Sequence, residues 1–194
     1  MPSGRVREFD ADEALDRAMG VFWRHGYEGT SLADLTAAMG INRPSLYSAF
    51  GNKEQLFRKV LDRYQAGPLG FSAAALEMPT ARGGVEGFLD GVIRCIRGGP
   101  APGCLVVSAA LVSGEDAEPV RRELARLRRG TVAALRGRFE RAASEGDLAA
   151  GTDCGALALY VAAVLDGLAV LAASGATEVD LGRVAELTMR LWPS

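Results

Sequence analysis

Basic side chains gather in one short stretch of this sequence, between residues 42 and 59. Its net charge of +3 comes from four basic residues and one acidic residue: Arg43, Lys53, Arg58, Lys59 and Glu54. Residues 10–34 carry two basic and six acidic side chains, a net charge of −4. Guanidinium and ammonium groups gathered in this way bind phosphates, which supply most of the affinity of proteins for nucleic acids. The charge pattern therefore favours a local nucleic-acid-binding surface.

The composition of the whole chain narrows the class of protein. The 194 residues carry a formal net charge of −2, and 48% of them are hydrophobic and 24% charged. Disordered chains are poorer in apolar residues and histone-like proteins are basic throughout, so both classes are excluded. The length allows one domain, or a small domain joined to a larger one.

Few side chains offer catalytic or metal-binding chemistry. His25 is the only histidine, and the chain has no Gly-rich phosphate loop and no G-x-S-x-G motif. We therefore expect no enzyme, no cofactor and no metal site, and an α-helical enzyme or carrier is the weakest alternative. The three cysteines form no C-x-x-C pair, and the first residues lack an apolar export segment. Both features are typical of a reduced, cytoplasmic protein.

Apolar residues recur every three or four positions along the chain, which predicts helices throughout and an all-α fold. Two short helices stand out in the N-terminal segment. Ser31 is a suitable N-cap for the first of them, and Gly40 can end it in a left-handed conformation. Asn42 can cap the next helix, with Pro44 tolerated in its first turn. Two helices joined by so short a turn form a helix-turn-helix.

A composition break at residues 65–70 divides the chain into residues 1–66 and 67–194. The first part has four expected helices, three of which make up the helix-turn-helix unit. In the second part we expect helices near residues 82–97, 104–113, 117–145, 153–174 and 178–191, about nine helices in all. The arginine-rich helix at 117–145 presents either a second nucleic-acid site or, as we favour, a solvated face whose stems cover apolar surface.

Three runs in the N-terminal part resemble the TetR/AcrR family of bacterial transcriptional regulators. They are FWRHGYEGTSLADL from Phe22, GINRPSLY from Gly40 and FGNKEQL from Phe50. The resemblance implies a DNA-binding domain over residues 1–66 and a ligand-binding and dimerisation domain over 67–194. It also implies a homodimer on a pseudo-palindromic operator in double-stranded DNA, most often a repressor that a small molecule releases.

The resemblance assigns phosphate contacts to four residues. Thr30 and Ser31 are expected at the N-terminus of the first short helix, where a hydroxyl and free N–H groups hold a phosphate. Tyr47 is expected to contact a phosphate through its hydroxyl, and Lys53 as a point charge. Phosphate contacts fix the register of a protein on any DNA.

Base recognition is assigned to two other residues. Arg43 and Ser45 are expected to point into the major groove, where an arginine donates to both O6 and N7 of a guanine. Such a pair discriminates against the wrong base by about 1–3 kcal/mol. The sequence departs from the family at Ala49, where an aromatic residue or a histidine often makes one more backbone contact.

The resemblance also implies a pocket in the second part, for a small and mainly apolar effector. The candidate lining residues have apolar bodies and few charges: Phe88, Val92, Cys95, Cys104, Val107, Leu111, Leu135, Phe139 and Tyr160. Cys95 and Cys104 are close in sequence across a Pro- and Gly-rich loop. A thiol- or metal-responsive regulator of the same fold therefore remains an alternative.

Residues 155–176 are apolar on almost every side, with Asp166 as the single charge. The stretch is long enough to span a membrane, but a central carboxylate opposes insertion, so we expect no membrane partner. A helix of this kind is readily buried between two subunits. The resemblance places the dimer interface on this helix and the last one, with the candidates Leu157, Val161, Val164, Leu168, Leu187 and Leu191.

Overall fold

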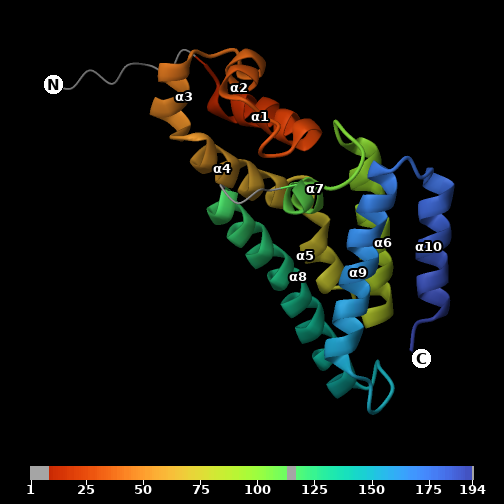
Figure 1. The fold of residues 1–194 in the computed structure, drawn as a ribbon. Helices are drawn as coiled ribbons and strands as arrows, with labels where there is room; N and C mark the ends of the chain where they lie inside the picture. Colours follow the sequence, from red (N-terminus) through yellow and green to blue (C-terminus); the bar gives the residue numbers. More distant parts are fainter. Residues whose placement is uncertain (1–8, 113–116, 194) are drawn as a thin grey trace.

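The structure is a computed structural model that describes residues 9–112 and 117–193, with side chains for residues 9–110 and 117–193. Helices are the only regular elements in these ranges, which confirms the all-α prediction (Figure 1). They are α1 (Ala11–His25), α2 (Leu32–Met39), α3 (Arg43–Phe50), α4 (Lys53–Ala66), α5 (Phe71–Leu76), α6 (Ala81–Gly98), α7 (Leu105–Val112), α8 (Glu118–Glu145), α9 (Cys154–Ala173) and α10 (Glu178–Arg190).

Helices α1 to α3 form a head at one end of the molecule, and α4 leads from it into the body (Figure 1). Asp10 caps α1, since its carboxylate accepts hydrogen bonds from the N–H groups of Asp12 and Glu13 at 2.8 and 3.2 Å. Phe22 and Phe57 meet edge to face, with ring centroids 4.9 Å apart, in the centre of the head. The head therefore has an aromatic core that α1 and α4 share.

An exposed ion pair also joins α1 to α4. The guanidinium of Arg63 donates to both carboxylate oxygens of Asp16, at 2.7 and 2.6 Å, and to Asp12 at 3.3 Å. Hydrogen bonding to Asp16 raises the pKa of Arg63. A two-point contact between planar groups fixes their relative orientation, so α1 and α4 are held in register on the outside as well as in the core.

The body contains one helix more than predicted. Helix α5 was not predicted because it has only six residues and no side-chain N-cap. It packs closely on α6, where a Cβ atom added at Gly91 would lie 2.1 Å from the Phe71 ring and one at Gly84 would lie 2.8 Å from the Ala75 carbonyl oxygen. Gly84 and Gly91 on α6 thus leave the space into which α5 packs.

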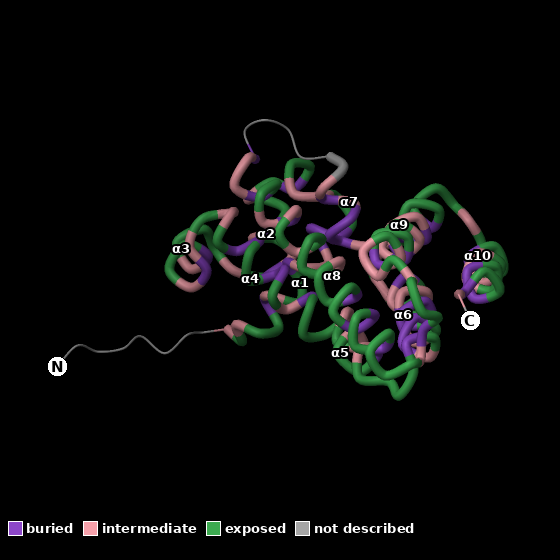
Figure 2. The backbone as a smooth tube through the Cα atoms, turned by 90° about the horizontal axis from the view of Figure 1, so that it is seen from below, coloured by how far each residue is buried: buried purple, intermediate pink, exposed green. Residues whose placement is uncertain are grey.

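The long helix α8 runs along one side of the body and packs against α9 (Figure 1). Helix α10 lies at the edge of the molecule beside α6 and α9, with its outward side exposed (Figure 2). The expected helix ranges in the body agree with the observed ones to within one or two residues.

Two apolar cores lie along the molecule, and the first crosses the sequence break at residue 66. It includes the head together with Leu105 and Val106 of α7 and Val120 and Leu124 of α8. The break coincides with the end of α4, but packing continues across it. The division into residues 1–66 and 67–194 therefore stays a prediction.

Arg138 on α8 is buried at the base of the second core. Its side chain is 3% exposed, and Nη2 donates to the carbonyl oxygens of Met78 and Pro79 at 3.0 and 3.2 Å. The carboxylate of Asp147 lies 3.9 Å from the same nitrogen and accepts a hydrogen bond from the N–H of Ala81. Arg138 thus ties α8 to the α5–α6 connection and to Asp147 at the start of the α8–α9 connection.

Removing this guanidinium should destabilise the fold. We expect Arg138→Ala to lower the free energy of unfolding by about 3 kcal/mol, because it leaves the carbonyls and Asp147 without their buried cation. Arg136→Ala is the matched control, since Arg136 is exposed and pairs with Glu140 on its own helix. We expect the control to change stability by less than about 0.5 kcal/mol in urea unfolding. Equal effects of the two substitutions would contradict the assignment.

Candidate nucleic-acid interface and ligand cavity

The turn between α2 and α3 is built by local hydrogen bonds. Gly40 adopts φ 68° and ψ 29°, in the left-handed region, and its N–H donates to the carbonyl oxygens of Thr36 and Ala37. Asn42 then caps α3 by accepting a hydrogen bond from the N–H of Ser45 at 2.9 Å. Pro44 lies in the first turn, where a missing N–H costs nothing. The helix-turn-helix predicted from these residues is present.

Helix α3 buries one side and presents the other to solvent. Leu46 and Phe50 point into the head, with 0% and 6% exposure. Arg43 is exposed and Tyr47 is half exposed, while Ser45 lies partly covered between them. In the described ranges no carboxylate lies within ion-pair distance of Arg43. The outer side of α3 therefore combines a charged, a phenolic and an alcoholic side chain that can reach a ligand.

Lys53 stands at the beginning of α4, next to this face. Its ammonium nitrogen lies 4.5 Å from the centroid of the Tyr27 ring, which is within the range of a cation–π contact. Partial burial lowers the pKa of Lys53, and the charge of Glu28 opposes that effect. The ammonium group is therefore positioned by an aromatic face, with part of its hydration already removed.

Ser31 and Thr30 precede α2 and differ in exposure. Ser31 is exposed and takes part in a capping box, in which its hydroxyl accepts from the N–H of Asp34 at 3.1 Å and donates to the Asp34 carboxylate at 2.6 Å. Thr30 is 1% exposed, and its hydroxyl donates to the carbonyl oxygen of Gly26 at 2.7 Å. Thr30 directly precedes the N-cap of α2, but its hydroxyl closes the loop after α1, so the expected phosphate contact through this hydroxyl is corrected.

Four of the eight arginines of α8 pair with glutamates on the same helix. Arg122 lies 3.6 Å from Glu118, and Arg136 lies 2.7 Å from Glu140. Such pairs support the interpretation of this surface as a solvated face.

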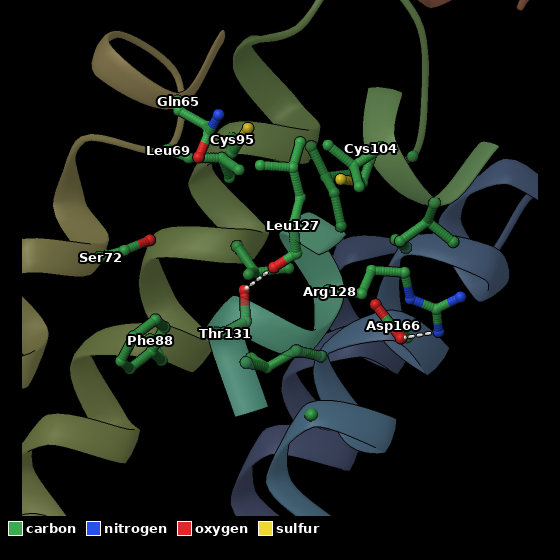
Figure 3. Close-up of a pocket in the computed structure, with 18 of the residues that line it drawn as sticks. Gln65, Leu69, Ser72, Phe88, Cys95, Cys104, Leu127, Arg128, Thr131 and Asp166 are labelled. Carbon is green, nitrogen blue, oxygen red and sulfur yellow. Dashed lines mark hydrogen bonds and ion pairs between the residues drawn. The ribbon is translucent and has the colours of Figure 1, made fainter. Parts of the chain in front are cut away.

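A cavity of about 320 Å³ lies in the body between α4, α6, α7, α8 and α9 (Figure 3). Five of the nine predicted pocket residues line it: Phe88, Val92, Cys95, Cys104 and Val107. The lining also includes residues that the sequence did not single out for this role, among them Tyr64, Gln65, Leu69, Phe71, Leu127, Arg128, Thr131, Leu159 and Asp166. A volume of this size is typical of small-molecule sites.

Three predicted pocket residues lie elsewhere. Leu135 and Phe139 are buried in the second core, where the Phe139 ring lies 5.6 Å from that of Trp192. Tyr160 is 43% exposed on the outer side of α9. The helical spacing placed them on the apolar side of their helices but could not say how far along α8 the cavity extends. The side chain of Leu111 lies outside the described residues.

Two places in the cavity hold interacting polar groups, and the polar side chains of Gln65, Ser72 and Thr131 also line it. The Tyr64 hydroxyl lies 3.3 Å from the sulfur of Cys104 and 3.6 Å from that of Cys95. Burial, followed by the neighbouring thiols, raises the pKa of Tyr64, and burial raises the pKa of Cys95. At the other place Arg128 and Asp166 form an ion pair between α8 and α9 (Figure 3).

Helix α9 has a buried side and an exposed side. Val161 and Leu168 are 0% exposed because they face the body, which corrects their assignment to a surface between subunits. Leu157 and Val164 are half-buried. The exposed apolar residues on α9, α10 and the residue after it are Leu159, Tyr160, Val170, Leu171, Val179, Leu187 and Leu191. Two of the six predicted positions, Leu187 and Leu191, thus belong to an outward apolar surface.

By length and composition alone, α9 is the one helix in the described residues that could span a membrane. Its mean hydropathy is 2.2, and 33% of the residues in the apolar window are buried. The ion pair between Asp166 and Arg128 fastens it to α8. In the described part of the chain no group of three or more His, Cys, Asp and Glu side chains is arranged to hold a metal ion.

Comparison with protein families gives two matches that together cover most of the chain. Residues 14–60 match the model of bacterial regulatory proteins of the tetR family, and residues 80–185 match the tetracyclin repressor-like C-terminal domain. The chain is 33% identical to the HTH-type transcriptional repressor ComR of Escherichia coli, over 98% of this chain and 92% of ComR. It is 34% identical to the uncharacterized HTH-type transcriptional regulator YezE of Bacillus subtilis, over 81% and 83% of the two chains.

Among solved structures, the chain is similar to a cysteine mutant of the TetR family transcriptional regulator CifR complexed with 26bp double-strand operator DNA. The two are 44% identical with a TM-score of 0.93, over 98% of this chain and 100% of the other. The likeness therefore covers head and body together.

Burial of the Cys95 thiol should make stability depend on pH. Its pKa is raised in the folded chain, so above the ordinary cysteine value of about 8.5 the folded state holds more protons than the unfolded state. The stabilisation is fully present below that pH and is lost as pH rises. In urea unfolding from roughly pH 7 to 9.5 we expect the free energy of unfolding to fall less steeply in Cys95→Ala than in the parent chain. Identical slopes would contradict the burial of this thiol.

Proposed function

This chain belongs to the tetR family of bacterial regulatory proteins, and from that premise we propose that it is a dimeric transcriptional repressor released from its operator by a small molecule. The observation that carries the proposal is the outer side of α3, where Arg43, Ser45 and Tyr47 project from a helix fixed by the α2–α3 turn. It acts on double-stranded DNA in the cytoplasm and needs no cofactor.

We propose a division of labour among the residues of the head. Arg43 and Ser45 enter the major groove, and an exposed arginine free of an ion pair in the described ranges can donate two hydrogen bonds to a guanine. Tyr47, Lys53 and Ser31 contact phosphates on either side. The contact with the Tyr27 ring already restricts the Lys53 side chain, so binding a phosphate would cost this side chain less conformational entropy. Thr30 supports the loop instead of contacting DNA.

Two copies of the head are needed to read a pseudo-palindromic operator. Dimeric helix-turn-helix proteins contact half-sites separated by one DNA turn, about 34–36 Å. We propose that the outward apolar surface of α9 and α10 pairs with its copy in a second subunit. Leu171, Leu187 and Leu191, which are between 43% and 65% exposed, are leucines of this surface. Burying this surface in a dimer would remove from water an apolar area that a soluble monomer rarely exposes.

The cavity is the proposed effector site. A molecule that binds better to the conformation with wrongly spaced heads would release the operator. The position of Tyr64, which lines the cavity and also packs on Trp23 of the head, supports such a link.

Substitutions in the head test the proposed contacts in gel-shift assays with palindromic DNA from upstream of the chain's own gene. We expect Arg43→Ala to weaken binding by about tenfold or more and to relax base preference, because a bidentate contact is lost.

Lys53→Ala should weaken binding to all sequences and lower the salt slope by about one. Arg129→Ala, on the exposed face of α8, is the control. Unchanged affinity in Arg43→Ala would refute the proposed reading head.

Substitution on the outward apolar surface tests the dimer. We expect Leu187→Asp to shift sedimentation from dimer to monomer, with a dissociation constant raised about thirtyfold or more, because a carboxylate would be buried between apolar side chains. Operator affinity should fall in parallel. Met78→Asp is the matched control, since Met78 is 43% exposed at the α5–α6 connection. A dimeric Leu187→Asp protein would exclude this surface.

A further inference from the structure

The hydroxyl of Tyr64 is an unusual feature of the cavity. Tyr64 is 0% exposed, and its phenol borders the hollow together with Cys95 and Cys104. Among the described residues the only hydrogen-bond partners of this hydroxyl are the two sulfurs. A phenol is protonated at neutral pH, and burial raises the pKa of Tyr64 further. The cavity therefore contains a permanent O–H donor.

Sulfur is a weak hydrogen-bond acceptor, whereas a carbonyl, ether or hydroxyl oxygen is a good one. A buried O–H group that bonds only to thiols has lost its water without gaining an equivalent partner. An oxygen atom brought into the cavity would restore that bond. The arrangement thus selects a ligand with an acceptor oxygen at the end where Tyr64, Cys95 and Cys104 meet.

The remaining lining indicates the rest of the ligand. The two charged residues of the cavity, Arg128 and Asp166, are paired with each other, and the Thr131 hydroxyl donates to the carbonyl oxygen of Leu127. A charged ligand would find no free counter-charge here. Most other lining side chains are apolar, among them those of Phe88 and Val92. The site therefore favours an uncharged, mainly apolar molecule.

A second hollow of about 260 Å³ continues the first between α5 and α8. The two share five lining residues: Gln65, Ser72, Phe88, Leu127 and Thr131. A ligand that extends from Tyr64 past Phe88 can therefore continue in this direction, along a wall that also contains the polar side chains of Gln65, Ser72 and Thr131.

We propose that the effector is an uncharged, elongated, mainly apolar molecule with one acceptor oxygen, and that this oxygen takes the Tyr64 O–H from Cys104. The inference rests on the proposed function, because it names the effector of that same cavity. The Tyr64 side chain also contacts the head. Tyr64 packs edge to face on Trp23 at 4.8 Å, and the indole N–H of Trp23 donates to the carbonyl oxygen of Gly103 at 3.2 Å. A ligand that draws Tyr64 into the cavity thus acts directly on α1 and α4.

Three probes of similar length separate the contributions: heptane, the methyl ketone heptanone, and heptanoate. Their binding to the free protein is measured by calorimetry, without DNA. We expect heptanone to bind about fivefold to tenfold more tightly than heptane, the gain of one hydrogen bond, and heptanoate to bind more weakly than heptanone. Equal binding of heptane and heptanone, or tighter binding of heptanoate, would overturn the proposal.

Two variants should change the ketone-to-alkane ratio in opposite directions. Tyr64→Phe removes the donor, so the ratio should fall to about one, while heptane binding persists and reports an intact cavity. Cys104→Ala removes the competing acceptor, so the ratio should rise. Cys154→Ala is the control, because this thiol lies outside the cavity and donates to the carbonyl oxygen of Thr152. A ratio that does not fall in Tyr64→Phe, in a protein that still binds heptane, would refute the role of this hydroxyl.

Operator release is measured separately, as loss of the gel shift on addition of heptanone. If the protein binds heptanone selectively but binds no operator DNA in the gel shift, the effector site would be supported and the regulatory role refuted. Operator binding without selectivity for heptanone would support the regulatory role and overturn the inference about the effector.

Discussion

Trp23 and Tyr64 meet edge to face where the head joins the body, and both direct their polar atoms to one short segment. The indole N–H bonds to the carbonyl oxygen of Gly103, and the phenol bonds to the sulfur of Cys104. Both aromatic side chains are almost fully buried, so neither can reorient without exposing apolar surface or leaving a donor unsatisfied. The orientation of the head therefore depends on where this segment lies, and the segment is also a wall of the cavity.

The elements of the head could be predicted from the sequence because their determinants are local. Asn42, Gly40 and Ser31 act through hydrogen bonds to residues a few positions away, and the observed caps are the expected ones. The environment of Thr30 could not be predicted in this way. Its burial depends on the path of the chain after α1, and the residues next to it in the sequence do not indicate that path. Helix α5 was missed for a similar reason. Its six residues are stabilised by packing against Gly84 and Gly91 on α6, which is a contact between separate elements.

The functional surfaces of the body depend on such long-range contacts and could be predicted only in part. Helix α9 is apolar on almost all sides, so its sequence has no amphipathic pattern to distinguish Val161, which faces inward, from Tyr160, which faces outward. The cavity is bounded by several helices, and its end along α8 is decided by packing around Phe139. Tyr64 is one of several apolar residues that recur at helical spacing along α4, and this pattern does not set it apart from the others. The available signal was its hydroxyl, since a buried phenol requires a partner.

The ion pair of Arg63 with Asp12 and Asp16 gives the head a mechanical property. It lies on the last turns of α4 and fastens that helix to α1, while Phe22 and Phe57 fasten the same two helices inside. Helix α4 has 14 residues and is about 21 Å long, with α3 attached at its far end. Because α1 and α4 are fastened to each other at both places, a displacement of α4 at Tyr64 would move α1 with it and would be carried to α3 at the other end of α4.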